Sequence, residues 1–585
     1  MRKRNVIALL SIVTALLMTG CSSDSTEQTG MADTTTTTAS SEETGSQAEG
    51  SEAQEDNTVV STKYGTVKGV QEGEVLTWYG IPYGKAPTGE LRWQAPQQPD
   101  AWTETLECTQ ASSPALQLSG TEVTGSEDCL RLNVYAKENS QNLPVLVFIH
   151  GGNNQTGNAG EIPGQDIVVN NNCVYVSIDY RLGLLGFNCL PALQTEEGST
   201  GNYAMLDIAA ALDWVKENIS AFGGDPENIT VSGFSAGGRD VMAMLISPIF
   251  EGKFQKAIAF SGGMTTADET LSANKIAEAI APLAVEDGKF ATEAEAFNWL
   301  LTSGQDVKDY LYSISSERLV ALMGNAGIRM SVFPHLYEDG VVIPMEGFDT
   351  TSYNDVPLMM LTGSTEFSMF CLGDAYFESE EMQGYTEEEI TAAKAFASKY
   401  GSDMYRIFNA ECSAEKMATN YSSNIYLCQV DYGGETSQMK ADLGDYGAFH
   451  GIFVPMLSTQ NNYTATFEGA FQKAGYVAMA KQYNNYLANF LATGDPNGEG
   501  LAQWTNWTPE NKNSMVFDGT ETDAVVELKD VSTTYEEIIR QMEADTSISP
   551  ELKEKVIKNV MNGRWFSDTL DQHFQSPNLW DVSIQ

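Results

Sequence analysis

Histidine, cysteine and basic residues are all scarce in this chain of 585 residues. The four histidines are scattered and the eight cysteines include no Cys-x-x-Cys pair, so the sequence offers no recognisable set of metal ligands and is no disulfide scaffold. Only 33 Lys and Arg accompany 79 Asp and Glu, and the formal charge of −46 argues against binding to nucleic acid. We expect no metal ion and no other cofactor.

The N-terminus carries an apolar run that is too short to cross a bilayer. Basic residues at positions 2–4 precede the run Val6–Met18, a pattern typical of a secretory signal. The run ends in Thr-Gly-Cys21, and small residues followed directly by cysteine resemble the lipobox of bacterial lipoproteins. We expect residues 1–20 to be a lipoprotein signal peptide and Cys21 to carry the lipid that anchors an extracytoplasmic protein to the membrane. The alternative is a cleaved, soluble secretory protein in which Cys21 is incidental.

Composition divides the remaining chain into three parts. Residues 22–57 contain nine Asp or Glu, no Lys or Arg and no aromatic residue. They bury too little apolar surface to fold, so residues 21–57 are expected to form a disordered tether. Residues 58–530 contain no internal linker or repeat, which predicts one large domain. Residues 531–585 carry charge-rich helical patterns and are expected to form a helical C-terminal extension.

Short apolar runs alternate with helical patterns along the domain. Runs without polar alternation, typical of strands buried on both faces of a parallel sheet, occur at residues 144–149, 174–178, 229–232, 256–260 and 358–361. Apolar residues at helical spacing predict helices over 205–216 and 236–245. This alternation predicts an α/β fold with a doubly wound central sheet, into which the mostly helical stretch 266–329 is inserted.

The sequence Gly-Phe-Ser-Ala-Gly at residues 233–237 contains a candidate nucleophile. It follows one predicted strand and leads into the predicted helix 236–245, which is the context of a nucleophile elbow. Such a strained turn projects its serine hydroxyl, here that of Ser235, outward. The beginning of the helix would supply backbone N–H groups and a positive dipole end beside a developing oxyanion. We predict that Ser235 is the catalytic nucleophile.

A serine hydroxyl needs a general base, and the four histidines are the candidates. His150 precedes a glycine-rich turn, His335 follows a proline in a loop, and His573 lies in the C-terminal extension. His450 alone stands late in the domain within a turn-like loop. That position matches the order of nucleophile, acid and histidine that accompanies such elbows. We predict that His450 is the base.

Longer stretches around these residues resemble the type-B carboxylesterase family, which includes the cholinesterases and the bacterial para-nitrobenzyl esterases. Residues 222–237 fit the serine signature of that family over its full length, and residues 127–134 fit its second signature with Arg131 off the pattern. Further matching stretches lie between about Gly65 and Phe517. The resemblance implies an α/β-hydrolase fold with helical insertions. It also implies that the protein hydrolyses a small-molecule carboxylic ester through an acyl-enzyme intermediate.

The same resemblance implies an acid and a disulfide. Glu366 falls where the family has the acid that would orient His450, although the loop here is shorter than the usual Asn-x-Asp-Glu-Gly. Cys108 and Cys129 stand at the positions of the family's first disulfide and are expected to be bonded to each other.

The resemblance also implies an oxyanion hole. Residues 150–153 read His-Gly-Gly-Asn where the family has His-Gly-Gly-Gly. The expected donors are therefore the backbone N–H groups of Gly152, Asn153 and Ala236. Asn replaces the third glycine, and of the non-glycine residues Asn best tolerates a positive φ.

Two departures from the cholinesterases concern the pocket. Those relatives have an acid before the serine and another three residues after the histidine, and here Phe234 and Phe453 occupy these positions. We predict that the two rings touch beside His450 and that the enzyme favours neutral, apolar esters. The sequence leaves two alternatives: a catalytically silent cholinesterase-like binding module, and an amidase or lactonase that uses the same triad.

Overall fold

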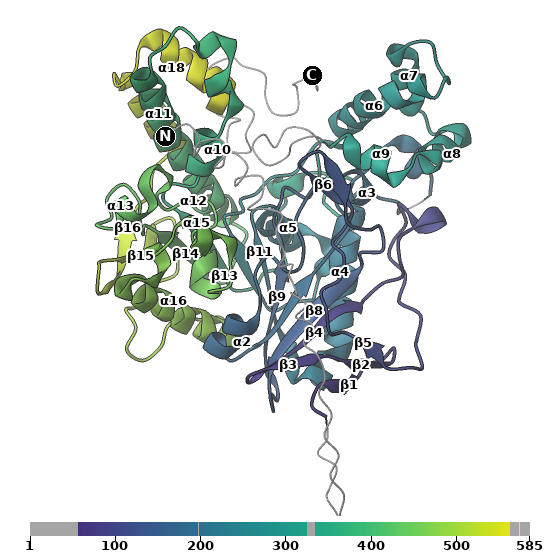
Figure 1. Ribbon diagram of the computed structural model, residues 1–585, viewed down its shortest axis with the longest axis horizontal. Coiled ribbons are helices and arrows are strands. Elements are labelled where there is room, and N and C mark those ends of the chain that lie inside the picture. The colour runs from purple at the N-terminus through teal and green to yellow at the C-terminus, as the bar shows by residue number, and fades with distance from the viewer. Residues whose placement is uncertain (1–55, 197, 324–333, 562–572, 574–585) are drawn as a thin grey trace, which may run out of the picture.

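The structure is a computed structural model that describes residues 56–196, 198–323, 334–561 and 573 (Figure 1). The expected signal peptide, the lipidation site Cys21 and nearly all of the expected tether lie outside these residues. Among the described helices, none combines the length and the apolar character needed to cross a membrane.

The centre of the fold is an 11-stranded sheet. From one edge to the other its strands are β16 (Ala524–Asp530), β15 (Asn513–Gly519), β14 (Ile425–Val430), β13 (Leu358–Gly363), β12 (Lys256–Phe260), β11 (Gly224–Phe234), β9 (Leu143–Ile149), β10 (Val174–Ile178), β8 (Arg131–Lys137), β4 (Val75–Pro82) and β3 (Val70–Glu72). The strands from β15 to β10 in this order are parallel, and the pairs at the two edges are antiparallel. Two small sheets combine β1 (Val59–Ser61), β2 (Thr66–Lys68) and β5 (Leu106–Glu107), and β6 (Gln117–Ser119) with β7 (Glu122–Thr124).

Helices cover both faces of the sheet. The described helices include α2 (Gln165–Asn171), α4 (Tyr203–Asn218), α5 (Ala236–Ile246), α6 (Glu269–Glu286), α7 (Glu293–Leu300), α8 (Gln305–Ser313), α9 (Ser316–Ala321), α10 (Ser368–Leu372), α11 (Glu387–Asn409), α16 (Ala474–Thr493), α17 (Tyr535–Ala544) and α18 (Pro550–Val556). Shorter or more peripheral helices are α3 (Gly183–Gly186), α12 (Glu411–Met417), α13 (Lys440–Leu443), α14 (Val454–Leu457) and α15 (Asn462–Thr466).

Side chains alternate along the central strands, so each face of the sheet packs against its own helices. In β9, Val145 and Val147 belong to one apolar cluster with residues of α4 and α5. Leu146 and Phe148 belong to a second cluster with residues of α2 and α16. Figure 1 shows α2 and α16 on one side of the sheet and α4 on the other. The predicted doubly wound sheet is therefore confirmed, with β9 to β13 at the five predicted strands.

Two helical groups follow the carboxyl ends of neighbouring parallel strands. The group α6–α9 follows β12 and occupies the described part of the predicted insertion, and the group α10–α11 follows β13 (Figure 1). Residues of α10 and α11 form a third apolar cluster with residues of α17 and α18 from the C-terminal extension. The extension is thus packed onto the domain through α11. The carboxyl edge of the sheet, from which both groups rise, is where open α/β sheets place their functional residues.

Candidate active site

Ser235 joins the end of β11 to the beginning of α5 in a strained turn. Its φ is 56° and its ψ is −114°, a combination that residues with a side chain rarely adopt. The glycines on either side permit the turn. A Cβ atom on Gly233 would lie 2.1 Å from the carbonyl oxygen of Gly237, and one on Gly237 would lie 2.1 Å from that of Ile149. The turn has the geometry predicted for a nucleophile elbow, and Ser235 is partly exposed between buried neighbours.

His450 and Glu366 form a close pair at the same edge of the sheet. Nδ1 of the histidine lies 2.6 Å from Oε2 of Glu366, whose side chain is fully buried at the end of β13. The other carboxylate oxygen, Oε1, accepts hydrogen bonds from the backbone N–H of Gly363 (2.6 Å) and from the hydroxyls of Ser261 (2.5 Å) and Thr362 (3.2 Å). These bonds compensate the burial of the carboxylate and fix its direction toward the imidazole.

The second nitrogen of His450 is available for chemistry. Because Glu366 accepts from Nδ1, the neutral imidazole carries its proton there and presents a lone pair at Nε2. That atom is buried and makes no hydrogen bond within the described part of the chain. The ring stands 4.8 Å from the ring of Phe234, the residue immediately before Ser235. The structure therefore brings the predicted acid, base and nucleophile to one place.

The predicted oxyanion turn lies directly against the predicted nucleophile, Ser235. A Cβ atom on Gly151 would lie 3.2 Å from the Cβ atom of Ser235. Gly152, Asn153 and Asn154 have φ angles of 97°, 56° and 55°, so the asparagine at the family's third glycine does adopt the positive φ expected of it. The N–H groups of Gly152 and Asn153 donate to no other group among the described residues. They are therefore free to bind an oxyanion at this turn.

Aromatic rings surround the imidazole of His450. Its ring centroid lies 5.0 Å from that of Phe370 in α10 and 5.7 Å from that of Tyr405 in α11, in addition to the contact with Phe234. The rings of Phe234 and Phe453 are 5.0 Å apart at an interplanar angle of 72°, which confirms the predicted aromatic pair. These rings enclose the imidazole in apolar surroundings, and the ring of Phe234 also borders the oxyanion turn, where a Cβ atom on Gly151 would lie 3.4 Å from it.

The remaining histidines have other surroundings. Nδ1 of His150 lies 2.8 Å from the carbonyl oxygen of Gly151, and burial lowers the pKa of His150 to about 4. The ring of the buried His335 lies 5.6 Å from that of Phe187. Nε2 of the exposed His573 lies 2.8 Å from the carboxylate of Glu543. The backbone of His150 also borders the elbow, where its carbonyl oxygen would lie 2.8 Å from a Cβ atom on Gly237, but among these histidines it is His450 whose ring contacts a fully buried carboxylate.

Several residues at the site were not predicted from the sequence. Ser261 follows β12 just as Ser235 follows β11, and neighbouring parallel strands end at one edge of the sheet, so this order was a usable signal. Arg239 and Asp240 are adjacent charges in α5, a helix whose residues are all buried. Charged side chains in a buried helix require polar partners, so the sequence could have indicated that Arg239 and Asp240 contact polar groups of another segment.

The predicted disulfide is absent: Cys108 and Cys129 are both free and buried. The two thiols lie in different surroundings. The thiol of Cys108 lies near the charges of Glu107 and Arg131, and burial raises its pKa to about 12. The thiol of Cys129 is fully enclosed near Arg181, and burial raises its pKa well above the usual value. The matching positions alone did not predict where each sulfur would point, so the expectation of a bond is wrong for this structure.

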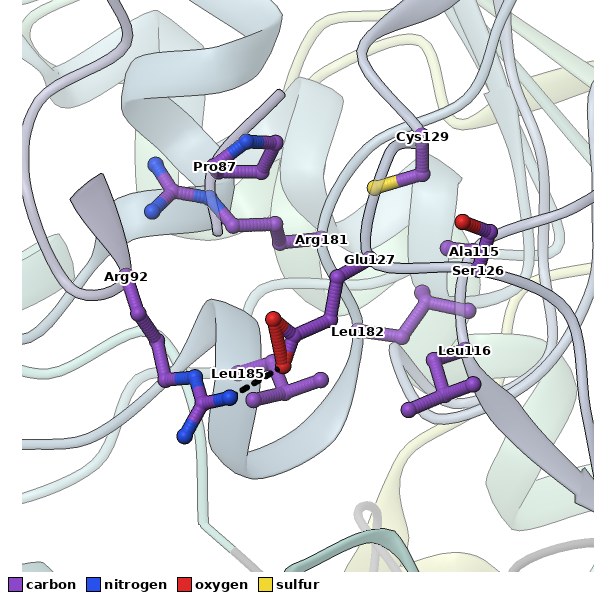
Figure 2. A pocket seen from close by; sticks show the side chains of 10 residues that line it. All are labelled: Pro87, Arg92, Ala115, Leu116, Ser126, Glu127, Cys129, Arg181, Leu182 and Leu185. Carbon is purple, nitrogen blue, oxygen red and sulfur yellow. Dashed lines mark hydrogen bonds and ion pairs between the residues drawn. The ribbon is translucent and has the colours of Figure 1, made fainter. Parts of the chain in front are cut away.

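A small pocket lies beside Cys129 (Figure 2). Its lining residues are Pro87, Arg92, Ala115, Leu116, Ser126, Glu127, Cys129, Arg181, Leu182 and Leu185. Figure 2 shows Arg92 and Glu127 paired across it, with 2.7 Å between Nη2 and Oε1. The lining includes none of the residues of the predicted triad, so this pocket is not the place where Ser235 would act.

Comparison with known proteins decides the family. A sequence profile described as the carboxylesterase family matches residues 56–392 and 374–535. The chain belongs to the carboxylesterase family. The para-nitrobenzyl esterase of Bacillus subtilis is 30% identical to this carboxylesterase over 498 residues, which cover 79% of this chain and 94% of that enzyme. Liver carboxylesterase 1 of Oryctolagus cuniculus is 29% identical over 551 residues, which cover 82% of this chain and 92% of that enzyme.

Solved structures agree with these matches. A carboxylesterase from Geobacillus stearothermophilus superimposes with a TM-score of 0.62 at 28% identity, over 81% of this chain and 98% of that chain. The predicted family resemblance and α/β-hydrolase fold are therefore confirmed, and the protein is a serine carboxylic-ester hydrolase. The alternative of a catalytically silent binding module is disfavoured, because these relatives are named as esterases.

Proposed function

We propose that this carboxylesterase hydrolyses neutral, apolar carboxylic esters with Ser235 as nucleophile, His450 as general base and acid, and Glu366 as the residue that orients the histidine. The observation that carries the proposal is the 2.6 Å contact between Nδ1 of His450 and a buried carboxylate oxygen of Glu366. It leaves the basic nitrogen Nε2 without a hydrogen-bond partner among the described residues, beside the strained turn that presents Ser235.

The reaction follows from these positions. Nε2 of His450 accepts the proton of the Ser235 hydroxyl while Oγ attacks the carbonyl carbon of the ester. The carbonyl oxygen becomes an oxyanion, which accepts hydrogen bonds from the N–H groups of Gly152, Asn153 and Ala236. When the intermediate collapses, the C–O bond to the alcohol breaks and His450 returns the proton to the departing oxygen. Water then attacks the acyl-enzyme by the same route and releases the acid.

The preference for neutral esters is supported by the rings around the histidine. Phe234, Phe370 and Tyr405 lie within 5.7 Å of the His450 ring and carry no formal charge, so a cationic ester would find no ion pair there and only the weaker cation–π attraction. One further carboxylate is close: Glu161 accepts the N–H of Gly151 (2.8 Å), and burial raises its pKa to about 7. Its charge is therefore weaker near neutral pH than that of an ordinary glutamate.

We also propose that the enzyme acts outside the cytoplasm, tethered to the membrane through a lipid on Cys21. The support is the sequence of the first 57 residues: a basic start, a short apolar run, a small residue before Cys21 and an acidic segment without aromatic residues. Metabolic labelling with a palmitate analogue tests this directly. Label should enter the wild-type protein and be absent from Cys21→Ala.

The decisive experiment removes the nucleophile. Ser235→Ala should lower kcat at least about a thousandfold, because the oxyanion hole alone supplies the remaining catalysis. A fluorophosphonate probe should label the wild type and not the variant, and labelling that persists in Ser235→Ala would refute the assignment. A panel of para-nitrophenyl esters of rising acyl length, with para-nitroacetanilide as the matched amide, defines the substrate class. An amide hydrolysed as fast as the ester would instead favour the amidase alternative.

A further inference from the structure

Two side-chain hydrogen bonds connect the oxyanion turn to the first turn of the nucleophile helix. Nη2 of Arg239 donates to Oδ1 of Asn153 (2.9 Å), and Nδ2 of Asn154 donates to Oδ1 of Asp240 (2.9 Å). The four side chains are all buried, with exposures between 0% and 5%. Adjacent residues on the turn thus pair with adjacent residues on α5, in matching order.

We propose that Arg239 and Asp240 are positioning residues that hold the two halves of the oxyanion hole at their working separation. The inference rests on the proposed role of Ser235. The turn supplies the N–H groups of Gly152 and Asn153, and α5 supplies that of Ala236. These donors belong to segments more than 80 residues apart in the chain, so their spacing depends on contacts between the turn and the helix. The bonds from Arg239 and Asp240 are such contacts.

Backbone conformation explains why the turn needs this support. Gly152, Asn153 and Asn154 all have positive φ angles, and two of the three are not glycine. Each non-glycine residue in this region stores strain, which persists only when surrounding contacts over-determine it. The side chain of Asn153 accepts a hydrogen bond from Arg239. A third glycine at this position has no side chain and could not make that bond.

Asn154 also has partners outside α5. The Tyr180 hydroxyl lies 2.9 Å from Oδ1 of Asn154 and 2.9 Å from the carbonyl oxygen of His150. The backbone N–H of Gly183 donates to the carbonyl oxygen of Asn154 (2.7 Å). Asn154 is therefore fixed between the body of the domain and Asp240. An error in donor position of about 1 Å can cost about a hundredfold in rate, so rigid attachment has a direct catalytic value.

Arg239 and Asp240 are both fully enclosed, and burial acts against the charge of each. Burial lowers the pKa of Arg239 and raises that of Asp240 to about 7. Both groups nevertheless keep polar partners on the turn, as buried polar groups require.

A double-mutant cycle tests the pair Asn153 and Arg239. Asn153→Gly restores the family's glycine and removes the acceptor of the bond from Arg239, and Arg239→Met removes the donor of that bond at similar length. Each single variant should lower kcat about tenfold, and the double variant should be no slower than the slower single, because both remove one shared contact. KM for the ester should change less than about twofold, while Ki for a trifluoromethyl ketone, which forms the tetrahedral adduct, should rise by the same factor as kcat falls.

Asp240 offers a test by conservative replacement. Asp240→Asn keeps an oxygen that can accept from Asn154 and should stay within about threefold of wild type, whereas Asp240→Ala should lose about tenfold in kcat. All rates are normalised to active sites titrated with a fluorophosphonate, so a loss of folded protein does not count as a loss of kcat.

Three results would overturn the proposal. The first is an Asn153→Gly variant with wild-type kcat, and the second is a double variant whose loss in kcat equals the product of the two single losses. The third is a rise in KM in the single variants without any change in Ki for the trifluoromethyl ketone. A wild-type enzyme that no fluorophosphonate labels would instead contradict Ser235 as the nucleophile. The failure of the proposed function is therefore distinguishable from the failure of this inference.

Discussion

Two kinds of contact hold the groups around Ser235. Amide and charged side chains hold the oxyanion turn, which is the polar side of the site, and aromatic rings enclose His450, which is the aromatic side. The polar side depends on two hydrogen bonds of 2.9 Å to Arg239 and Asp240. The aromatic side depends on ring contacts of 4.8–5.7 Å around the imidazole. Hydrogen bonds are directional and fix positions to a few tenths of an ångström, whereas ring contacts exclude water and tolerate small shifts.

This difference indicates that the two sides affect different properties of the enzyme. Donors to an oxyanion act through accurate placement, so defects on the polar side should reduce kcat. Rings that line a pocket act through their size and polarity. Substitutions on the aromatic side should therefore change which substrates are preferred, and the local stability of the helices that carry the rings. Glu366 connects the two, because it is a buried carboxylate with polar partners that holds a histidine packed among rings.

The largest effect is expected where the two sides meet. Glu366→Gln keeps the shape of the side chain, but its amide can present N–H to Nδ1 of His450 and stabilise the wrong tautomer. A substitution of this kind lowers kcat about 10³- to 10⁴-fold in triads. Steady-state kinetics on a para-nitrophenyl ester should show the loss in kcat with KM nearly unchanged. Glu554→Gln, an exposed position on α18, is the matched control. A Glu366→Gln enzyme that keeps more than a tenth of wild-type kcat contradicts the role of Glu366.

A charge on the aromatic side should alter selectivity rather than kcat alone. The wild type is expected to favour a neutral ester over its quaternary-ammonium isostere. Phe234→Glu places a carboxylate beside His450, and Coulomb attraction should shift the kcat/KM ratio about tenfold toward the cationic ester. Phe234→Gln is the control, because it loses the same ring without gaining a charge. Equal ratios in the two variants, or a wild type that prefers the cationic ester tenfold, would contradict an apolar pocket.

The sequence alone could predict those residues of the site that are marked by their neighbours along the chain. Ser235 could be predicted because a strand, two glycines and a helix follow one another within 20 residues, and His450 because few histidines competed with it. Glu366 needed the family resemblance, since no local pattern marks an acid 84 residues away from its partner. Its bonds to Ser261 and Thr362, and the pairing of Asn153 with Arg239, depend on contacts between distant segments, which one sequence does not display.

The same reason explains the error over Cys108 and Cys129. A disulfide requires two Cβ atoms to approach and face each other, and the separation of two cysteines along the chain does not determine this. The C-terminal extension shows a related limit. Its helices were expected from their periodicity, but their packing against α11, which carries one wall of the site, follows only from the three-dimensional structure.

That packing leads to the smallest expected effect. The carboxylesterase match ends at residue 535, and α17 begins there. Leu552 of α18 is 1% exposed within the cluster that contains α11, and α11 carries Tyr405 to the His450 ring. The Tyr400 hydroxyl of α11 also donates to Oδ2 of Asp545 (2.7 Å), beyond the end of α17. The C-terminal extension therefore packs against α11, the helix that carries Tyr405 of the aromatic side.

Leu552→Ala should remove about 2–5 kcal/mol of local stability, as large-to-small changes in an apolar cluster do. Amide hydrogen exchange should become faster in α11, while exchange in β9 and β11 stays unchanged. Because ring contacts tolerate small shifts, kcat for a short ester should change less than about twofold, and KM for a long-chain ester should rise about two- to threefold. Glu554→Ala, exposed on the same helix, should change neither quantity. Should Leu552→Ala instead lower kcat as much as the variants of the oxyanion turn, the aromatic wall would also act by accurate placement, and the contrast between the two sides of Ser235 would not hold.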